Sequence, residues 1–247
     1  MPKKILVIVE GEKKEPEIMS RVLDAYSLSN REIVSYKANI YDLYDHLHEA
    51  YDDQIEDVDI QEFLKEMHPD AESAVLLDDN YTDILLIFDF DPQDNRYHAD
   101  KLKKLLTIFT DSTEMGRLYI NYPMVESFFH FRSLEDQSFL DEMFTLEQIQ
   151  SGGAYKAYVN RLTCIHHLYD VGQKEIARMI RLILMKIGRI CQKEHDIDGN
   201  ELTEKLQEVA TIQMLRLAEH QDMFVLNTCV LFVYEYNPRM LEWLDKR

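Results

Sequence analysis

The sequence predicts an α/β protein, in which helices flank a parallel sheet, with an all-helical subdomain at its C-terminal end. Two short, uninterrupted apolar runs, Ile5–Val9 and Ile84–Phe88, are typical of strands that are buried on both faces, as in parallel sheets. Up to about residue 150, segments with helical periodicity alternate with strand-like segments, and this alternation favours a parallel sheet. Beyond residue 153 the pattern is helical only.

The elements of the first 150 residues can be placed in order. Strands are predicted at 4–10, 32–36, 83–91 and 117–121, and helices at 41–51, 99–109 and 124–131, with a further helix beginning near Pro16. Pro16 suits the first turn of a helix, because an amide N–H has no partner within the helix there. Pro92 ends the strand at 83–91, since proline cannot donate to a sheet.

The chain is expected to divide into two domains. Residues 52–82 read as an acidic, mostly helical insertion within an α/β domain that covers 1–150. Ser151–Gly153 interrupts the pattern, because serine and glycine favour loops. Residues 151–247 are therefore expected to form the helical subdomain, with helices at about 154–170, 173–195, 201–222 and 224–245.

The net charge of −19 is unevenly distributed. Residues 41–95 hold 18 acidic residues against 1 basic residue, whereas the rest of the chain is close to neutral. Such a surface repels free nucleic acid at long range. A local basic surface outside the acidic block 41–95 remains compatible with this composition.

Other features of the composition favour a cytoplasmic protein. The apolar run after the first residues is too short for a signal peptide, and no apolar stretch is long enough to span a bilayer. Cys164, Cys191 and Cys229 are far apart and have apolar sequence neighbours, so we expect reduced cysteines packed in the core.

Carboxylates follow both of the apolar runs. Glu10 and Gly11 come directly after the first run, and Asp89 and Asp91 end the second. The carboxyl ends of parallel strands line the crevice where ligands bind, and alternation along a strand directs Asp89 and Asp91 to one side. Three carboxylates at one edge would suit Mg²⁺ or Mn²⁺, which prefer oxygen ligands. Either motif taken alone reads equally well as a polar turn after a strand.

Further residues could complete such a site. Lys13 and Lys14 could bind a phosphate, although each alone reads better as a solvated lysine. Glu126 is a lone acid in a short apolar helix that follows the strand at 117–121, and a buried carboxylate needs a partner. The alternative for Glu126 is an exposed helix position.

One predicted helix carries a basic stripe. Six side chains lie within roughly 140° of arc at 100° per residue: Lys174, Arg178, Arg181, Lys186, Arg189 and Lys193. The stripe, with Arg178, Arg181 and Arg189 as its candidate substrate-binding residues, could follow the backbone of RNA or DNA. The alternative is a solvated face that is paired with nearby acids. His166 and His167 have no partner at metal-ligand spacing, and ordinary packing is favoured for them.

Three motifs in order carry a resemblance to a known family. They are Glu-Gly-Glu-Lys-Lys-Glu-Pro at 10–16, Asp-Phe-Asp at 89–91, and Asn-Tyr-Pro-Met-Val-Glu at 121–126 followed by Phe131. This order resembles the TOPRIM proteins of bacterial phage defence. It is most similar to the RloB/AbiLii-like branch, and more loosely similar to OLD-family nucleases and the TOPRIM subunit of PARIS-type systems. The resemblance covers about residues 3–131.

The resemblance implies a TOPRIM-like fold and an Mg²⁺-dependent endonuclease acting in antiviral defence or abortive infection. It implies Glu10 as general acid/base or metal ligand, Asp89 and Asp91 as metal ligands, and Glu126 as an additional ligand. Topoisomerase and primase members have a third Asp where this chain has Gln93. The chain also lacks a candidate strand-passage domain, so topoisomerase activity is not implied.

Three functional interpretations stay open. The first is the nuclease, a hydrolase of RNA (tRNA included) or DNA. The second is a latent or non-catalytic TOPRIM-like subunit that docks on an ATPase sensor through its acidic block or forms a homo-oligomer. The third is a small-molecule phosphoesterase, which would need no basic groove.

Overall fold

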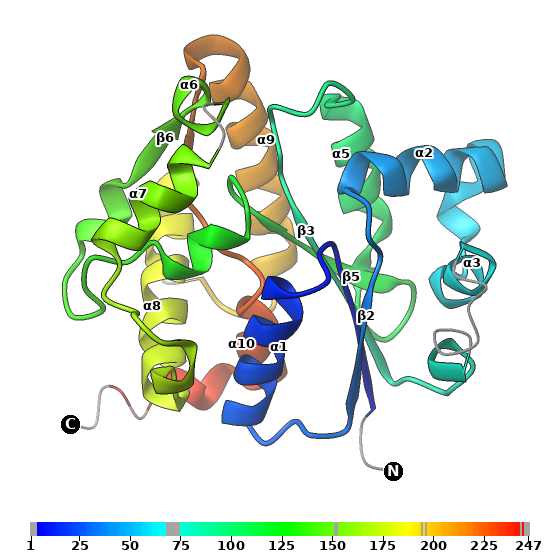
Figure 1. The fold of residues 1–247 in the computed structure, drawn as a ribbon, viewed down its shortest axis with the longest axis horizontal. Coiled ribbons are helices and arrows are strands. Elements are labelled where there is room, and N and C mark those ends of the chain that lie inside the picture. Colours follow the sequence, from blue (N-terminus) through cyan, green and yellow to red (C-terminus); the bar gives the residue numbers. More distant parts are fainter. Residues whose placement is uncertain are drawn as a thin grey trace. The chain divides into compact units, whose positions relative to one another are not determined.

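The chain folds into two compact units (Figure 1). The computed structural model describes residues 4–67, 75–150, 153–193, 195, 197–242 and 244. The first unit comprises Met1–Ser20, Leu28–Phe88 and His98–Tyr119, and the second comprises Arg21–Ser27, Asp89–Tyr97 and Ile120–Arg247. The division therefore lies earlier in the chain than the boundary at 150/151 suggested by the sequence.

A five-stranded sheet in the order β2-β1-β3-β5-β4 is the framework of the first unit. Its strands are β1 (Ile5–Val9), β2 (Arg31–Ser35), β3 (Asp83–Asp89), β4 (Thr110–Asp111) and β5 (Gly116–Asn121). β1 runs parallel to both β2 and β3, whereas β4 pairs antiparallel with β5. Every residue of β1 and β3 is buried, which explains why both sequences are continuously apolar. The predicted α/β class with a mostly parallel sheet is confirmed.

Helices accompany this sheet in the first unit (Figure 1). They are the start of α1 (Lys14–Ala25), α2 (Ile40–Tyr51), the 3₁₀ helix η1 (Asp52–Asp57), α3 (Ile60–Met67) and α5 (Ala99–Ile108). α2 begins with a capping box, in which Asn39 Oδ1 accepts from the amides of Tyr41 and Asp42 at 3.0 Å and Asp42 accepts from the Asn39 amide at 3.3 Å. The predicted insertion at 52–82 is helical over most of 52–67, while 68–74 lie outside the described residues.

The second unit is mostly helical. Its helices are α6 (Leu146–Gln150), α7 (Ala154–Leu162), α8 (Gln173–Ile190), α9 (Leu202–His220) and α10 (Leu231–Tyr236), with 3₁₀ helices η2 (Val125–Phe129), η3 (Ser138–Asp141), η4 (Leu168–Asp170) and η5 (Pro238–Leu241). α8 packs against α9 and buries the apolar face that its sequence predicted. In the described part of the chain, no helix is both long and apolar enough to cross a membrane.

The prediction of a purely helical region after residue 153 is wrong at one point. β7 (Asp222–Phe224) pairs antiparallel with β6 (Met143–Thr145). Next to this pair, the amides of Tyr122 and Leu226 each donate to the other's carbonyl, at 2.7 and 2.9 Å. Strands of three residues are too short to show a period, so no sequence pattern predicts them. Leu226, which follows β7, is therefore joined by backbone hydrogen bonds to the segment that follows β5.

Candidate functional site

Asp89 belongs to a chain of buried polar side chains in the second unit. It is the last residue of β3, and its Oδ1 accepts from the side-chain amide of Asn121 at 3.3 Å. Asn121 Oδ1 in turn accepts from Asn227 Nδ2 at 2.9 Å, and Asn227 Nδ2 also lies 3.3 Å from Ser127 Oγ. Asn121, Asn227 and Ser127 are all fully buried. Satisfied buried networks of this kind fix side-chain orientation, so the carboxylate of Asp89 is held in place.

Asp91 has an unusual backbone conformation. Its φ of 40° lies in the left-handed region, which non-glycine residues seldom adopt. Its amide donates to the Pro123 carbonyl at 3.2 Å, and its Oδ1 accepts from the side chain of Gln93 at 3.0 Å. Strained conformations persist where surrounding contacts impose them, and such residues cluster at functional sites. The side chain of Gln93 thus helps to hold the carboxylate of Asp91 in place.

Glu126 is a buried acid in η2. η2 packs against α7, which carries the buried Tyr155. Burial raises the pKa of Tyr155 well above its ordinary value, and the negative charges of Glu126 and Asp89 raise it further. Both carboxylates therefore disfavour ionisation of the Tyr155 hydroxyl.

His130 and Glu142 extend this neighbourhood. His130 Nδ1 lies 3.0 Å from the Tyr155 hydroxyl, and its Nε2 lies 3.2 Å from Glu142 Oε2. Burial lowers the pKa of His130 to about 4. Lys186, which is fully buried, donates to the carbonyls of Glu142 and Phe139 at 2.6 and 2.8 Å, and burial lowers its pKa to about 7. The sequence analysis assigned no role to His130, Glu142, Tyr155 or Asn227, because none has a motif or a spacing that marks it.

The first unit carries its own carboxylates after β1. The Glu10 amide donates to the Ile87 carbonyl at 3.2 Å, and the Glu10 carbonyl accepts from the Lys37 amide at 3.0 Å. Glu15 is buried in the first turn of α1. A Cβ added to Gly11 would lie only 2.6 Å from Glu15 Oε2, so the glycine leaves room for this carboxylate.

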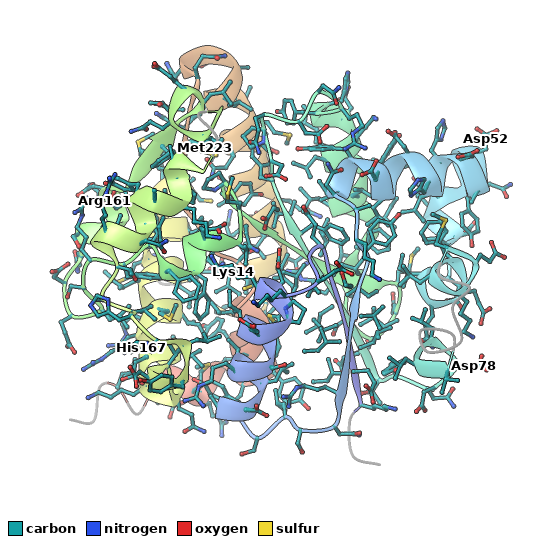
Figure 2. All side chains as sticks on the ribbon, viewed as in Figure 1. Lys14, Asp52, Asp78, Arg161, His167 and Met223 are labelled. Atoms are coloured by element: carbon teal, nitrogen blue, oxygen red, sulfur yellow. The ribbon has the colours of Figure 1, made fainter. Side chains whose placement is uncertain are left out.

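The predicted site residues therefore fall into two groups. Glu10, with Lys13 and Lys14, belongs to the first unit, whereas Asp89, Asp91 and Glu126 belong to the second. Lys13 is exposed, and Lys14 is the first residue of α1 (Figure 2).

The basic stripe on α8 is largely paired. Arg178 forms an ion pair with Glu135, and Arg189 forms one with Asp141 at 2.8 Å. Arg181 approaches the carbonyl of Leu241 at 3.5 Å. Including Lys186 in the stripe is wrong, because its side chain is fully buried. The described contacts agree better with a structural face than with an open cationic surface.

One other expectation fails in the segment between α7 and α8. Cys164 is exposed, whereas Cys229 is buried as expected and Cys191 is intermediate. His166 and His167 are exposed (His167 is labelled in Figure 2), and the ring of His167 stacks on Tyr169 with centroids 5.0 Å apart. The sequence places apolar neighbours around these residues but does not show that the segment lies at the surface.

The donors of the candidate site suit a hard divalent cation. In the second unit, Asp89, Asp91 and Glu126 offer carboxylate oxygens, the ligands that Mg²⁺ and Mn²⁺ prefer. Among the described residues, no group of three or more His, Cys, Asp and Glu side chains is arranged to hold a metal ion. Asp89 and Glu126 are the two buried acids of this unit among the described residues.

No family model, curated protein or solved structure matches the chain.

Proposed function

We propose that the protein is a TOPRIM-like, Mg²⁺- or Mn²⁺-dependent endonuclease that cleaves RNA or DNA in bacterial defence against phage. The observation that supports this most is the pair of buried carboxylates, Asp89 and Glu126, near an asparagine that holds Asp89 at 3.3 Å. Burying two like charges is costly, and groups of this kind are retained mainly where a ligand or a reaction needs them. The motifs that resemble phage-defence TOPRIM proteins contain both residues.

Each residue of the proposed site has a separate role. Asp89 and Glu126 would hold the cation, with Asp91 beside Asp89 in the same turn. When bound, the cation supplies charge neutralisation at the phosphate and a more acidic water. Asn121 orients Asp89, and Asn227 orients Asn121. In the first unit, Glu10 is the proposed general acid/base, while Lys13 and Lys14 are proposed to bind phosphate oxygens.

A small phosphoester is the second candidate substrate. It is favoured by the ion pairs of the α8 stripe, in which Arg178 and Arg189 already contact Glu135 and Asp141. Phosphate contacts dominate affinity for nucleic acids, so a paired stripe contributes less to polymer binding. A small substrate needs no such surface.

The test compares variants that keep the shape of each side chain. Purified protein would be assayed with single-stranded RNA, single-stranded DNA and bis-p-nitrophenyl phosphate, with Mg²⁺ or Mn²⁺. Asp89→Asn and Glu126→Gln should each lower turnover at least about 100-fold, because they remove the charge that holds the cation. Glu219→Gln is the control, since Glu219 is exposed on α9; its activity should be unchanged.

Thermal melting separates chemistry from folding. Asn at position 89 keeps an oxygen that accepts from Asn121, so the melting temperature should change by only a few degrees, about the effect of 1 kcal/mol. A folded Asp89→Asn protein with full metal-dependent activity would rule out the assigned role. Cleavage of the small ester alone would favour the second candidate.

A further inference from the structure

The segment between α7 and α8 exposes a pair of stacked rings. Tyr169, in η4, is 69% exposed, and its ring stacks on that of His167, with centroids 5.0 Å apart and 14° between the ring planes. His167 is exposed as well. Aromatic rings at a surface are platforms on which the bases of single-stranded nucleic acids stack, because every base has a flat π face. The two rings offer such a platform.

The backbone that carries these rings is anchored. Arg21 belongs to the same unit, and it donates from Nε to the Val171 carbonyl at 2.6 Å and from Nη2 to the Tyr169 carbonyl at 2.7 Å. At the start of the segment, the Cys164 amide donates to the Phe131 carbonyl at 2.7 Å. The side chain of Val171 is fully buried. A surface that is already ordered loses less conformational entropy when a ligand binds.

The same segment is basic, although the net charge of the chain is −19. Residues 154–174 hold three Lys and Arg residues against one acid, Asp170. The cations are Lys156, Arg161 and Lys174. Their side chains are exposed, and within the part of the chain that the structure describes none of them forms an ion pair or a hydrogen bond. Unlike the ion-paired arginines of α8, they can contact phosphate groups without first losing a partner.

The length of the chain keeps two of these cations within reach of the rings. Arg161 precedes His167 by six residues, and Lys174 follows Tyr169 by five. At no more than about 3.6 Å per residue, their Cα atoms lie within about 22 Å and about 18 Å of the stack. Figure 2 shows Arg161 and His167 on the same side of the second unit. A strand that stacks on the rings therefore brings its phosphates towards the cations.

We propose that residues 156–174 form a binding surface for single-stranded RNA or DNA, in which a base stacks on the ring of Tyr169 while Lys156, Arg161 and Lys174 contact phosphates on either side. The acidic residues elsewhere in the chain do not prevent this, because exposed charges farther away than about 8 Å are largely screened at physiological salt. The surface needs neither the metal site nor the cleavage of the proposed function.

The test is fluorescence anisotropy of labelled oligo(U) and oligo(dT) of twelve nucleotides, in EDTA, so that no divalent cation supports cleavage. Tyr169→Ala should weaken the binding of both strands about 5-fold or more, because it removes the ring on which a base stacks. Tyr169→Phe keeps the ring and should bind like the wild type. Thermal melts establish that both variants are folded.

The matched control is a second Tyr–His stack in acidic surroundings. Tyr44 stacks on His48 in α2, with centroids 6.0 Å apart, within the acidic block 41–95. Tyr44→Ala should leave oligonucleotide affinity unchanged, since the neighbouring acids repel phosphate. Equal affinities of Tyr169→Ala and Tyr44→Ala would overturn the proposal, as would a wild-type protein that binds neither strand.

The salt dependence tests the cations. Replacing Lys156, Arg161 and Lys174 together with Gln should lower the slope of log affinity against log salt by about 2, because each contact with a single strand contributes about 0.7. An unchanged slope would contradict the phosphate contacts. Loss of affinity in this triple variant but not in Tyr169→Ala would also overturn the proposal, and it would favour a cationic patch that binds an acidic protein.

The outcomes separate this inference from the proposed function. A protein that binds the oligonucleotides through Tyr169 but cleaves no phosphodiester keeps the inference and loses the nuclease. A nuclease whose Tyr169→Ala variant binds them with unchanged affinity does the reverse.

Discussion

The two compact units differ in where they keep their polar side chains. Among the described residues, the buried polar side chains of the first unit are Glu15, Asp83 and Arg117, and all others lie in the second unit. The first unit places charges at its surface, in pairs such as Lys101 with Asp45 at 2.5 Å. A buried polar group is costly unless it is satisfied, whereas an exposed ion pair contributes little either way. Most of the buried polar side chains that the structure describes therefore belong to the second unit.

The largest effect on stability should come from breaking the buried chain of amides. Asn227→Ala leaves Asn121 Oδ1 without the donor that now lies at 2.9 Å. We expect a loss of about 2–4 kcal/mol in the free energy of unfolding, because a buried acceptor loses its partner. Asp45→Asn, which removes a surface ion pair in the first unit, should cost less than about 1 kcal/mol. Urea denaturation measures both, and equal losses would contradict the contrast between the units.

The free energy of unfolding should decrease in acid because His130 is buried. Burial lowers the pKa of His130 to about 4 in the folded protein, from an ordinary value of 6.5. Between these values the unfolded state binds more protons, so stability falls as the pH drops from about 6.5 to about 4, by up to about 3 kcal/mol. Above pH 6.5 this contribution is fully present.

The measurement is urea denaturation of the wild type and of His130→Asn at several values of pH. Other carboxylates titrate in both proteins, so the difference between the two slopes isolates His130. If the two slopes coincide, the imidazole does not resist protonation and is not buried as described.

A smaller effect, on stability, is expected in the first unit. In Gly11→Ala the new Cβ would lie 2.6 Å from Glu15 Oε2, so the carboxylate must move. Because the displaced atoms end a flexible side chain, the protein should stay folded and lose about 1 kcal/mol in the free energy of unfolding. Gly188→Ala is the control, since its nearest atom is 3.9 Å from the new Cβ. Equal stability of Gly11→Ala and the wild type, measured by urea denaturation, would show that the Glu15 carboxylate does not need this space.

The smallest effect should come from the basic stripe. Replacing Arg178, Arg181 and Arg189 together with Gln should change affinity for single-stranded nucleic acid only slightly, because Arg178 and Arg189 are already paired. Each true phosphate contact would add roughly 0.7–0.9 to the slope of log affinity against log salt. Fluorescence anisotropy at several salt concentrations measures this slope. A slope that falls by about 2 or more would show that the stripe follows the backbone.

Local sequence patterns predicted the framework well. β1 and β3 are continuous apolar runs, and each forms the expected buried strand at the centre of the sheet. The carboxylates that follow these strands could also be predicted as site candidates. The direction of the chain places them at the carboxyl ends of the strands, where ligands bind in parallel sheets. The helices α2, α5, α8 and α9 also lie close to their predicted ranges.

The remaining parts depend on contacts between distant segments. β6 and β7 are too short to be predicted from their own sequences, and they pair only when the folded chain brings them together. Nothing near Asn227 in the sequence shows that it donates to Asn121, which lies 106 residues earlier. Lys186 falls on the basic side of its helix by periodicity, yet its ammonium group contacts the carbonyls of Phe139 and Glu142 in the interior. Periodicity assigns a face, whereas the partner that covers this face is set by tertiary packing.

The connection from Asn227 back to Asn121 has a consequence during protein synthesis. Chains are made from the N-terminus at about 5–20 residues per second, and early segments fold before later ones emerge. The sheet strands leave the ribosome long before the 226–228 segment, which pairs with Tyr122 and donates to Asn121 and the Ile120 carbonyl. Asn121, which holds Asp89, therefore lacks the support of Asn227 until the 226–228 segment has been translated. The orientation of this carboxylate is completed only after the strands of the sheet have been made.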